Sequence, residues 1–245
     1  MIRDWDILGV MSAHTVDWSA LRAPAADARE ATGLRERHKR ATRKMLVDTA
    51  IEMFLARGFD AVTVVEIAKV CNVSPTTVFN HFPTKESLVL HLPDDLLAAL
   101  RATLADTGTT PLAGMMRILA GELDNLTSWL DAQNDRAWAA GAVQRFEAMV
   151  RDTPALQAHY RAMLQQLTAA ACEVLAERTG LDAGDPEPQI AATALVGLWS
   201  IQVNSSVQHL DGHLSPAQVS DAVTADVERA ARLLESGLAA FAAGG

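Results

Sequence analysis

Residues 63–87, TVVEIAKVCNVSPTTVFNHFPTKES, predict two short helices joined by a tight turn. Thr63 and Glu66 have the spacing of a capping box, in which each side chain accepts a hydrogen bond from a backbone N–H at a helix start. Ser74 and Pro75 predict a second helix start, because serine caps well and proline at the first helical position loses no hydrogen bond. Two short helices with a three-residue turn between them are typical of a helix-turn-helix, whose second helix enters the DNA major groove. The segment therefore predicts DNA binding.

The residues just before this segment are first basic and then amphipathic. Residues 35–44, RERHKRATRK, hold six Lys/Arg against one Glu. Residues 45–58, MLVDTAIEMFLARG, have apolar side chains at helical spacing and end at a glycine, which is free to take a positive φ. They predict a first helix that packs on the helix-turn-helix. Four cations of the basic run either form an arm that reaches DNA or lie on a solvated surface, and the sequence leaves both open: Arg35, Arg37, Lys39 and Arg40.

Residues 35–92 resemble the DNA-binding domain of the TetR family of bacterial transcriptional regulators. The matching stretch is residues 43–90, and its most specific pieces are FDAVTVVEIA and NHFPTKESL. Asn72 stands where the family often has glycine, and asparagine tolerates the left-handed region, so the turn is expected to form. Phe79 stands where the family often has tyrosine, and it has no hydroxyl to donate to a phosphate.

The second helix of the motif carries the candidate base-reading residues. Thr76, Thr77 and Asn80 have short polar side chains that can reach base edges or a thymine methyl group. Four further residues look like phosphate contacts, which position a domain without reading sequence: Thr63, Ser74, His81 and Lys85. Helix capping and an ordinary solvated surface use the same residue types.

Charge and cysteine content favour a cytoplasmic DNA-binding protein. Residues 34–92 hold nine Lys/Arg against six Asp/Glu, whereas residues 93–245 hold nine against nineteen, and the whole chain has a net charge of −9. One basic module in an acidic chain suits a protein that touches DNA through one face. Cys71 and Cys172 are expected to be buried free thiols in a reducing cytoplasm. No stretch approaches the ~20 consecutive apolar residues of a membrane span, so no membrane partner is expected.

The hydrophobic periodicity predicts an all-α protein in three parts. Residues 1–33 are interpreted as a flexible leader, residues 34–92 as a three-helix helix-turn-helix domain, and residues 93–245 as a larger helical effector-binding and dimerisation domain. A linking helix is expected to run from residue 87 up to Pro93. Six helices should follow it, at residues 94–106, 112–130, 134–151, 153–178, 187–210 and 216–242.

The last two predicted helices indicate a homodimer. Residues 189–203, QIAATALVGLWSIQV, are apolar nearly all round, and a helix of that kind must be buried on all sides. One stripe holds Ile190, Ala194, Gly197 and Ile201, and the other holds Ala192, Val196, Trp199 and Val203. The final helix has one apolar face as well, so two helices from each subunit would form a four-helix interface. The alternative is that both helices belong to the core of one subunit.

The larger domain is rich in methionine and aromatic residues. Such residues usually form core, but the family resemblance implies a cavity for an apolar or amphipathic effector. The candidate lining residues are Trp129, Trp138, Phe146, Trp199 and Gln202. His209 and His213 fall in a predicted loop without further ligands, so no metal and no cofactor are expected.

These features together predict a ligand-responsive transcriptional repressor, released from double-stranded operator DNA by a small effector. No nucleophile elbow, phosphate-binding glycine loop or acid–base pair is recognisable, which favours a non-enzyme. An activator remains an alternative within the same class. An all-helical enzyme or small-molecule carrier with an incidental basic segment is the alternative from another class.

Overall fold

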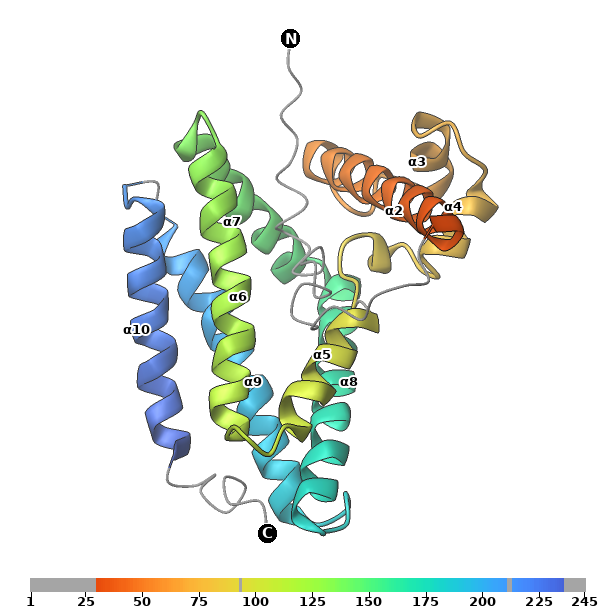
Figure 1. Cartoon of the computed structure of the whole chain (residues 1–245). Coiled ribbons are helices and arrows are strands. Elements are labelled where there is room, and N and C mark those ends of the chain that lie inside the picture. The colour runs from red at the N-terminus through yellow and green to blue at the C-terminus, as the bar shows by residue number, and fades with distance from the viewer. Residues whose placement is uncertain (1–29, 93, 211–212, 236–245) are drawn as a thin grey trace. The chain divides into compact units, whose positions relative to one another are not determined.

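The computed structural model describes residues 30–92, 94–210 and 213–235, and within these ranges it contains helices but no strands (Figure 1). The all-α prediction is therefore confirmed. The predicted leader lies outside the described residues except for its last four positions. The elements are α2 (Glu30–Arg57), α3 (Val64–Val70), α4 (Pro75–His81), the 3-10 helix η2 (Glu86–Leu88), α5 (Asp94–Ala105), α6 (Pro111–Ala132), α7 (Arg136–Asp152), α8 (Pro154–Thr179), α9 (Pro186–His209) and α10 (Pro216–Glu235).

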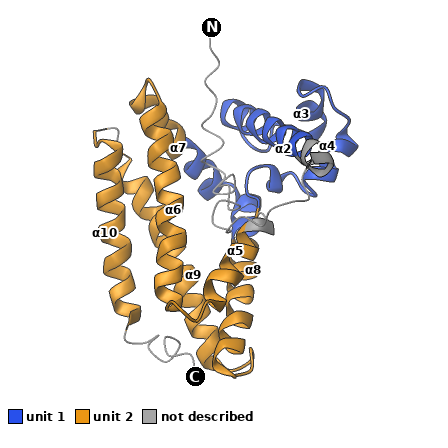
Figure 2. Ribbon diagram, in the orientation of Figure 1, with its two compact units in different colours: residues 1–91, 145–160 blue, residues 92–144, 161–245 orange. Residues whose placement is uncertain are grey.

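The chain divides into two compact units (Figure 2). Unit 1 comprises residues 1–91 and 145–160, so it joins the helix-turn-helix to the end of α7 and the start of α8. Unit 2 comprises residues 92–144 and 161–245. The sequence interpretation had grouped residues 145–160 with the larger domain instead.

The core of unit 1 forms where the second half of α2 meets the helix-turn-helix. Its largest buried side chains come from α2, α3, α4 and the segment after α4. They include Leu46, Ile51, Phe54, Ile67, Val78 and Phe82, each at most 1% exposed. This burial is the main force that stabilises two seven-residue helices, because helices of that length are marginal alone.

Two features of unit 1 differ from the sequence interpretation. The first helix is longer than expected, because α2 runs through the whole basic segment from Glu30. The predicted helix from residue 87 to Pro93 is wrong, since only the three residues of η2 are helical. Leu88, Val89 and Leu90 are all buried.

In unit 2, α10 packs against α9 and α6. The apolar face of α10 is buried within the subunit: Val219, Val223 and Val227 are at most 2% exposed. The predicted members of that face beyond Glu235 lie outside the described residues. The prediction of two apolar stripes on α9 is confirmed: Ala192, Val196 and Trp199 are buried, whereas Ile190 and Ile201 are 68% and 41% exposed.

Among the described residues, α9 is also long and apolar enough to cross a membrane by length and composition alone. The expectation that no stretch approaches such a span was therefore too strict. Half of the apolar window of α9 is buried against other helices. A buried core helix of a protein outside the membrane also meets this criterion of length and composition, so the match is weak evidence of a membrane span.

Candidate nucleic-acid interface and effector region

The start of α3 is held by the predicted capping box, which the structure confirms. The Glu66 backbone N–H donates to Thr63 Oγ1 at 3.2 Å, and the Thr63 N–H donates to Glu66 Oε2 at 2.8 Å. Arg57, from the end of α2, donates to Glu66 Oε1 at 2.8 Å. The Arg57 hydrogen bond and those from Thr63 lower the pKa of Glu66 to about 2. The box is thus also an anchor between α2 and α3.

The turn between α3 and α4 forms as predicted. Asn72 takes the left-handed conformation with φ of 54°, and it is the one non-glycine residue with positive φ among those described. The Thr77 N–H donates to Ser74 Oγ at 3.0 Å, and Pro75 opens α4. Local signals of three or four residues therefore determine where α4 begins.

The exposed face of α4 carries two of the predicted base-reading residues. Thr76 and Asn80 are exposed, and they lie four residues apart on one side of the helix. Phe79 lies beside them and is 50% exposed. Thr77 is half-buried, and its hydroxyl is 2.8 Å from that of Ser74. The opposite side of α4 is anchored by buried Val78.

Of the predicted phosphate contacts, three already serve the fold. The hydroxyl of Thr63 accepts from the Glu66 N–H and donates to Glu66 Oε2 at 2.9 Å. The hydroxyl of Ser74 caps α4. Lys85 donates to the Phe59 carbonyl at 2.5 Å, and its ammonium lies 4.2 Å from the centre of the Phe59 ring. Such an ammonium keeps two N–H donors for a further acceptor.

Sequence reasoning missed the role of Arg43. Its guanidinium donates to the His81 carbonyl at 2.8 Å and lies 4.2 Å from the centre of the Phe82 ring. Arg43 therefore joins α2 to the C-terminal end of α4. Desolvation, and then the nearby charges of Arg43 and Lys39, lower the pKa of His81. No local pattern marks this contact, since its partners are 38 residues apart.

Four of the predicted effector-binding residues lie in unit 2. Trp129 on α6 and Trp199 on α9 are buried, and Trp138 on α7 is 36% exposed. Gln202 is buried on α9 and donates to the Leu119 carbonyl of α6 at 3.0 Å. The fifth, Phe146, is buried in unit 1. The structure thus brings α6 and α9 together through Gln202 but separates Phe146 into the other unit.

Two buried carboxyl groups were not anticipated. Burial raises the pKa of Glu122 to about 8 and that of Glu147 to about 7, the latter opposed by Arg151. Glu122 is partly exposed as a whole residue, but its Oε1 atom is buried without a hydrogen-bond partner. Trp129 Nε1 is likewise buried and unpartnered. The two residues are seven apart on α6, which places them on the same side of the helix.

Two hollows within unit 2 are lined by residues other than the predicted effector contacts. A groove of about 540 Å³ lies between α8 and α9, beside Cys172 and Gly197. A much smaller hollow of about 20 Å³ lies near the end of α9, beside His209 and Leu210. His209 itself lies 3.1 Å from Asp226 on α10, so its ring serves the contact between the last two helices.

Comparison with known proteins gives matches to two segments of the chain, one over the helix-turn-helix and one over most of the later helices. Residues 46–92 match the profile described as bacterial regulatory proteins, tetR family, and residues 127–239 match that of the MftR C-terminal domain. The HTH-type transcriptional regulator TcmR of Streptomyces glaucescens is 33% identical over 198 residues, which are 73% of this chain and 81% of the relative. The uncharacterized HTH-type transcriptional regulator YuxN of Bacillus subtilis (strain 168) is 37% identical over 49 residues, 20% of this chain and 17% of its own.

Among solved structures, the chain is similar to native NalD, described as the secondary repressor of the MexAB-OprM multidrug efflux pump in Pseudomonas aeruginosa. The match has a TM-score of 0.47 and 20% identity, and it covers 78% of this chain and 97% of NalD.

Proposed function

Because this chain belongs to the TetR family of bacterial transcriptional regulators, we propose that it is a homodimeric, ligand-responsive repressor acting in the cytoplasm. It binds double-stranded operator DNA and releases it when a small apolar or amphipathic effector binds. The observation that carries this proposal is the exposed side of α4, which presents Thr76 and Asn80 on a helix fixed by Ser74 and Arg43.

In this proposal α4 lies in the major groove. Asn80 can pair with adenine through two hydrogen bonds, and the methyl of Thr76 can contact a thymine methyl. Phe79 adds an apolar contact on the same face. The proposed phosphate contacts around this helix are Thr63, Ser74, His81 and Lys85. Lys85 would use the two N–H groups that do not donate to the Phe59 carbonyl.

The exposed stripe of α9 supports the homodimer. Ile190 and Ile201 are exposed apolar side chains, and Gly197 between them leaves room for a close approach. An exposed apolar stripe of this kind is stabilised when a second copy covers it. A symmetric pair of subunits would present two α4 helices to half-sites about 34–36 Å apart. We propose that the same stripe of a second subunit, and not a membrane, covers this stripe.

Effector binding is proposed in the helices of the larger domain. Trp129, Trp138, Trp199 and Gln202, all in unit 2, are the candidate contacts, and Glu122 joins them because its Oε1 atom is buried without a hydrogen-bond partner. A protonated carboxyl donates a hydrogen bond, so Glu122 suits an effector with an acceptor oxygen. Binding would favour a dimer geometry that misfits the operator.

The proposal is tested by electrophoretic retardation of the DNA upstream of the gene. The purified wild type should retard this DNA more strongly than an unrelated duplex, and a ligand that copurifies with the protein should abolish the shift. Mass spectrometry of the purified protein identifies that ligand. Absence of any preference for the upstream DNA, with the ligand removed, would refute the repressor function.

A further inference from the structure

Residues 37–45 of α2 contribute no buried side chain to the core of unit 1. Among the residues whose side chains the structure describes, Leu46 is the first buried one in α2. The helix starts at Glu30, so about 24 Å of it precedes the packed half. Tertiary burial therefore does not explain why residues 37–45 are helical.

The charge of this extension opposes helix formation in isolation. Residues 35–44 contain six Lys/Arg and one Glu. Several cations lie four residues apart, as in Lys39 and Arg43 or Arg40 and Lys44, and like charges at this spacing destabilise a helix. Glu36, three and four residues before Lys39 and Arg40, offsets only part of this repulsion, because it is one carboxylate among six cations. Lys44 is compensated by Asp48 at 3.0 Å. Lys39 and Arg40 are exposed, and a bound polyanion would remove their repulsion.

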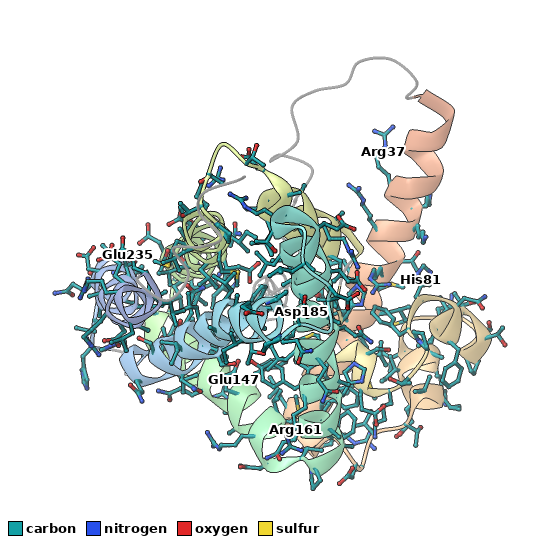
Figure 3. All side chains as sticks on the ribbon, turned by 90° about the horizontal axis from the view of Figure 1, so that it is seen from below. Arg37, His81, Glu147, Arg161, Asp185 and Glu235 are labelled. Atoms are coloured by element: carbon teal, nitrogen blue, oxygen red, sulfur yellow. The ribbon has the colours of Figure 1, made fainter. Side chains whose placement is uncertain are left out.

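The extension lies next to the end of α4. Arg43 contacts the His81 carbonyl, and Lys39 is one helical turn before Arg43 on the same side of α2. The charge of Lys39 is close enough to lower the pKa of His81. Figure 3 labels Arg37 on the extension and His81 beside the same helix, both within unit 1. Lys39 therefore lies on the side of α2 that faces the C-terminal end of α4.

We propose that the basic extension of α2, through Lys39 and Arg40, binds DNA phosphates adjacent to the major groove occupied by α4. The contact is electrostatic and independent of sequence, and it enlarges the interface beyond the helix-turn-helix. It rests on the proposed function, since it needs α4 at the DNA. A membrane surface fits the extension poorly, because residues 35–44 contain no large apolar side chain and an interfacial helix needs an apolar face.

The test compares the full-length double variant K39Q/R40Q with the wild type. Gln has nearly the helix propensity of Lys and Arg, so α2 should persist, and circular dichroism checks this. The matched control is R117Q/R232Q, which removes two exposed cations from unit 2 and leaves the same net charge. Binding to the operator and to an unrelated duplex is measured between 50 and 200 mM salt.

The K39Q/R40Q variant should bind both DNAs more weakly, and its log–log salt slope should be shallower by about four, because each of the two subunits of the proposed dimer loses two cations. Across this salt range it should lose roughly a hundredfold less affinity than the wild type loses. The preference for operator over unrelated duplex should not change. Hydroxyl-radical footprinting should show loss of protection at phosphates flanking each half-site.

An unchanged salt slope for K39Q/R40Q would overturn the proposal, as would an equal change in R117Q/R232Q. Binding of the wild type to phosphatidylglycerol vesicles that K39Q/R40Q abolishes, with DNA slopes unaltered, would also overturn it. A failure of the repressor function gives a different result: the wild type would then show no preference for the operator over the unrelated duplex. The difference in salt slope between the wild type and K39Q/R40Q would still show whether the extension contacts DNA phosphates.

Discussion

Arg43 on α2 and His81 on α4 are joined by a 2.8 Å hydrogen bond from the guanidinium to the backbone carbonyl. The same guanidinium lies 4.2 Å from the centre of the Phe82 ring. His81 has one of the backbone carbonyls that a helix leaves unpaired at its C-terminal end, and that carbonyl accepts the hydrogen bond from Arg43. The orientation of α4 is therefore set by a long-range contact as well as by its own caps.

Arg43→Ala should lower the free energy of unfolding by about 1–3 kcal/mol, because a charged hydrogen bond and a ring contact are lost. Operator affinity should fall further than stability alone explains, since the end of α4 is no longer held. Arg43→Lys should recover only part of both, because an ammonium lacks the planar fork of arginine. Urea unfolding and operator titration measure the two effects. A variant as stable as the wild type would contradict this role.

Asn72→Ala should destabilise the protein by about 1 kcal/mol, because Asn72 has φ of 54° and a Cβ without a polar group disfavours that conformation. Asn72→Gly should be neutral or stabilising by comparison. Asn134→Ala, in the exposed loop before α7, is the matched control. Denaturant unfolding measures the midpoints of Asn72→Ala, Asn72→Gly and Asn134→Ala against the wild type. Equal midpoints for Asn72→Ala and Asn72→Gly would contradict a role for the left-handed conformation.

Gly197→Glu should convert the proposed dimer to monomers. A Cβ added at Gly197 meets no atom within 4 Å in its own subunit, and glutamate favours a helix more than glycine does. Any loss of association therefore comes from burying a charge against the partner. Sedimentation at micromolar concentration measures this, with Leu233→Glu on the exposed side of α10 as control. A wild type that sediments as a monomer would refute the interface.

Trp138→Ala should change the response to effector while leaving operator binding nearly intact. Trp138 is the most exposed of the candidate effector contacts in unit 2, so its loss costs little core packing. The wild type should melt at a higher temperature with effector present, because the ligand binds only the folded state. That increase should shrink in the variant. Joint loss of effector response and operator binding would instead show that Trp138 is structural.

Stability should decrease with rising pH through the titration of Glu122. Burial raises its pKa to about 8 in the folded protein, so the folded state keeps a proton that the unfolded state releases above its ordinary value. This contribution is complete below about pH 4.5 and is lost as the pH rises through about 8. The slope is at most ~1.4 kcal/mol per pH unit, because a single proton is involved, and partial exposure of the residue narrows the pH window over which it applies.

Glu122→Gln should therefore flatten the dependence of unfolding free energy on pH between 5 and 8. Glu147→Gln should do the same over a window that ends near pH 7, where its own pKa lies. Glu228→Gln, an exposed carboxyl on α10, is the control. Identical pH profiles for the wild type and Glu122→Gln would show that this carboxyl is ionised in the folded state.

Interactions within a few residues were predictable from the sequence. The capping box of Thr63 and Glu66, the Ser74 cap with Pro75, and the left-handed Asn72 each depend on groups at most four positions apart. Helix periodicity likewise located the helices of the larger domain and separated the two stripes of α9. Together these determined the helix-turn-helix and with it the class of function.

The tertiary structure alone decided which side chains meet across the chain. The Lys85 ammonium lies on Phe59, 26 residues away, and Arg43 reaches His81 across 38 residues. Leu88, Val89 and Leu90 are buried in a segment that forms no α-helix, although periodicity favoured one, and the apolar face of α10 packs against α9 and α6. Hydrophobic pattern shows that a face must be buried but not what covers it, because burial energy depends on area and is non-directional.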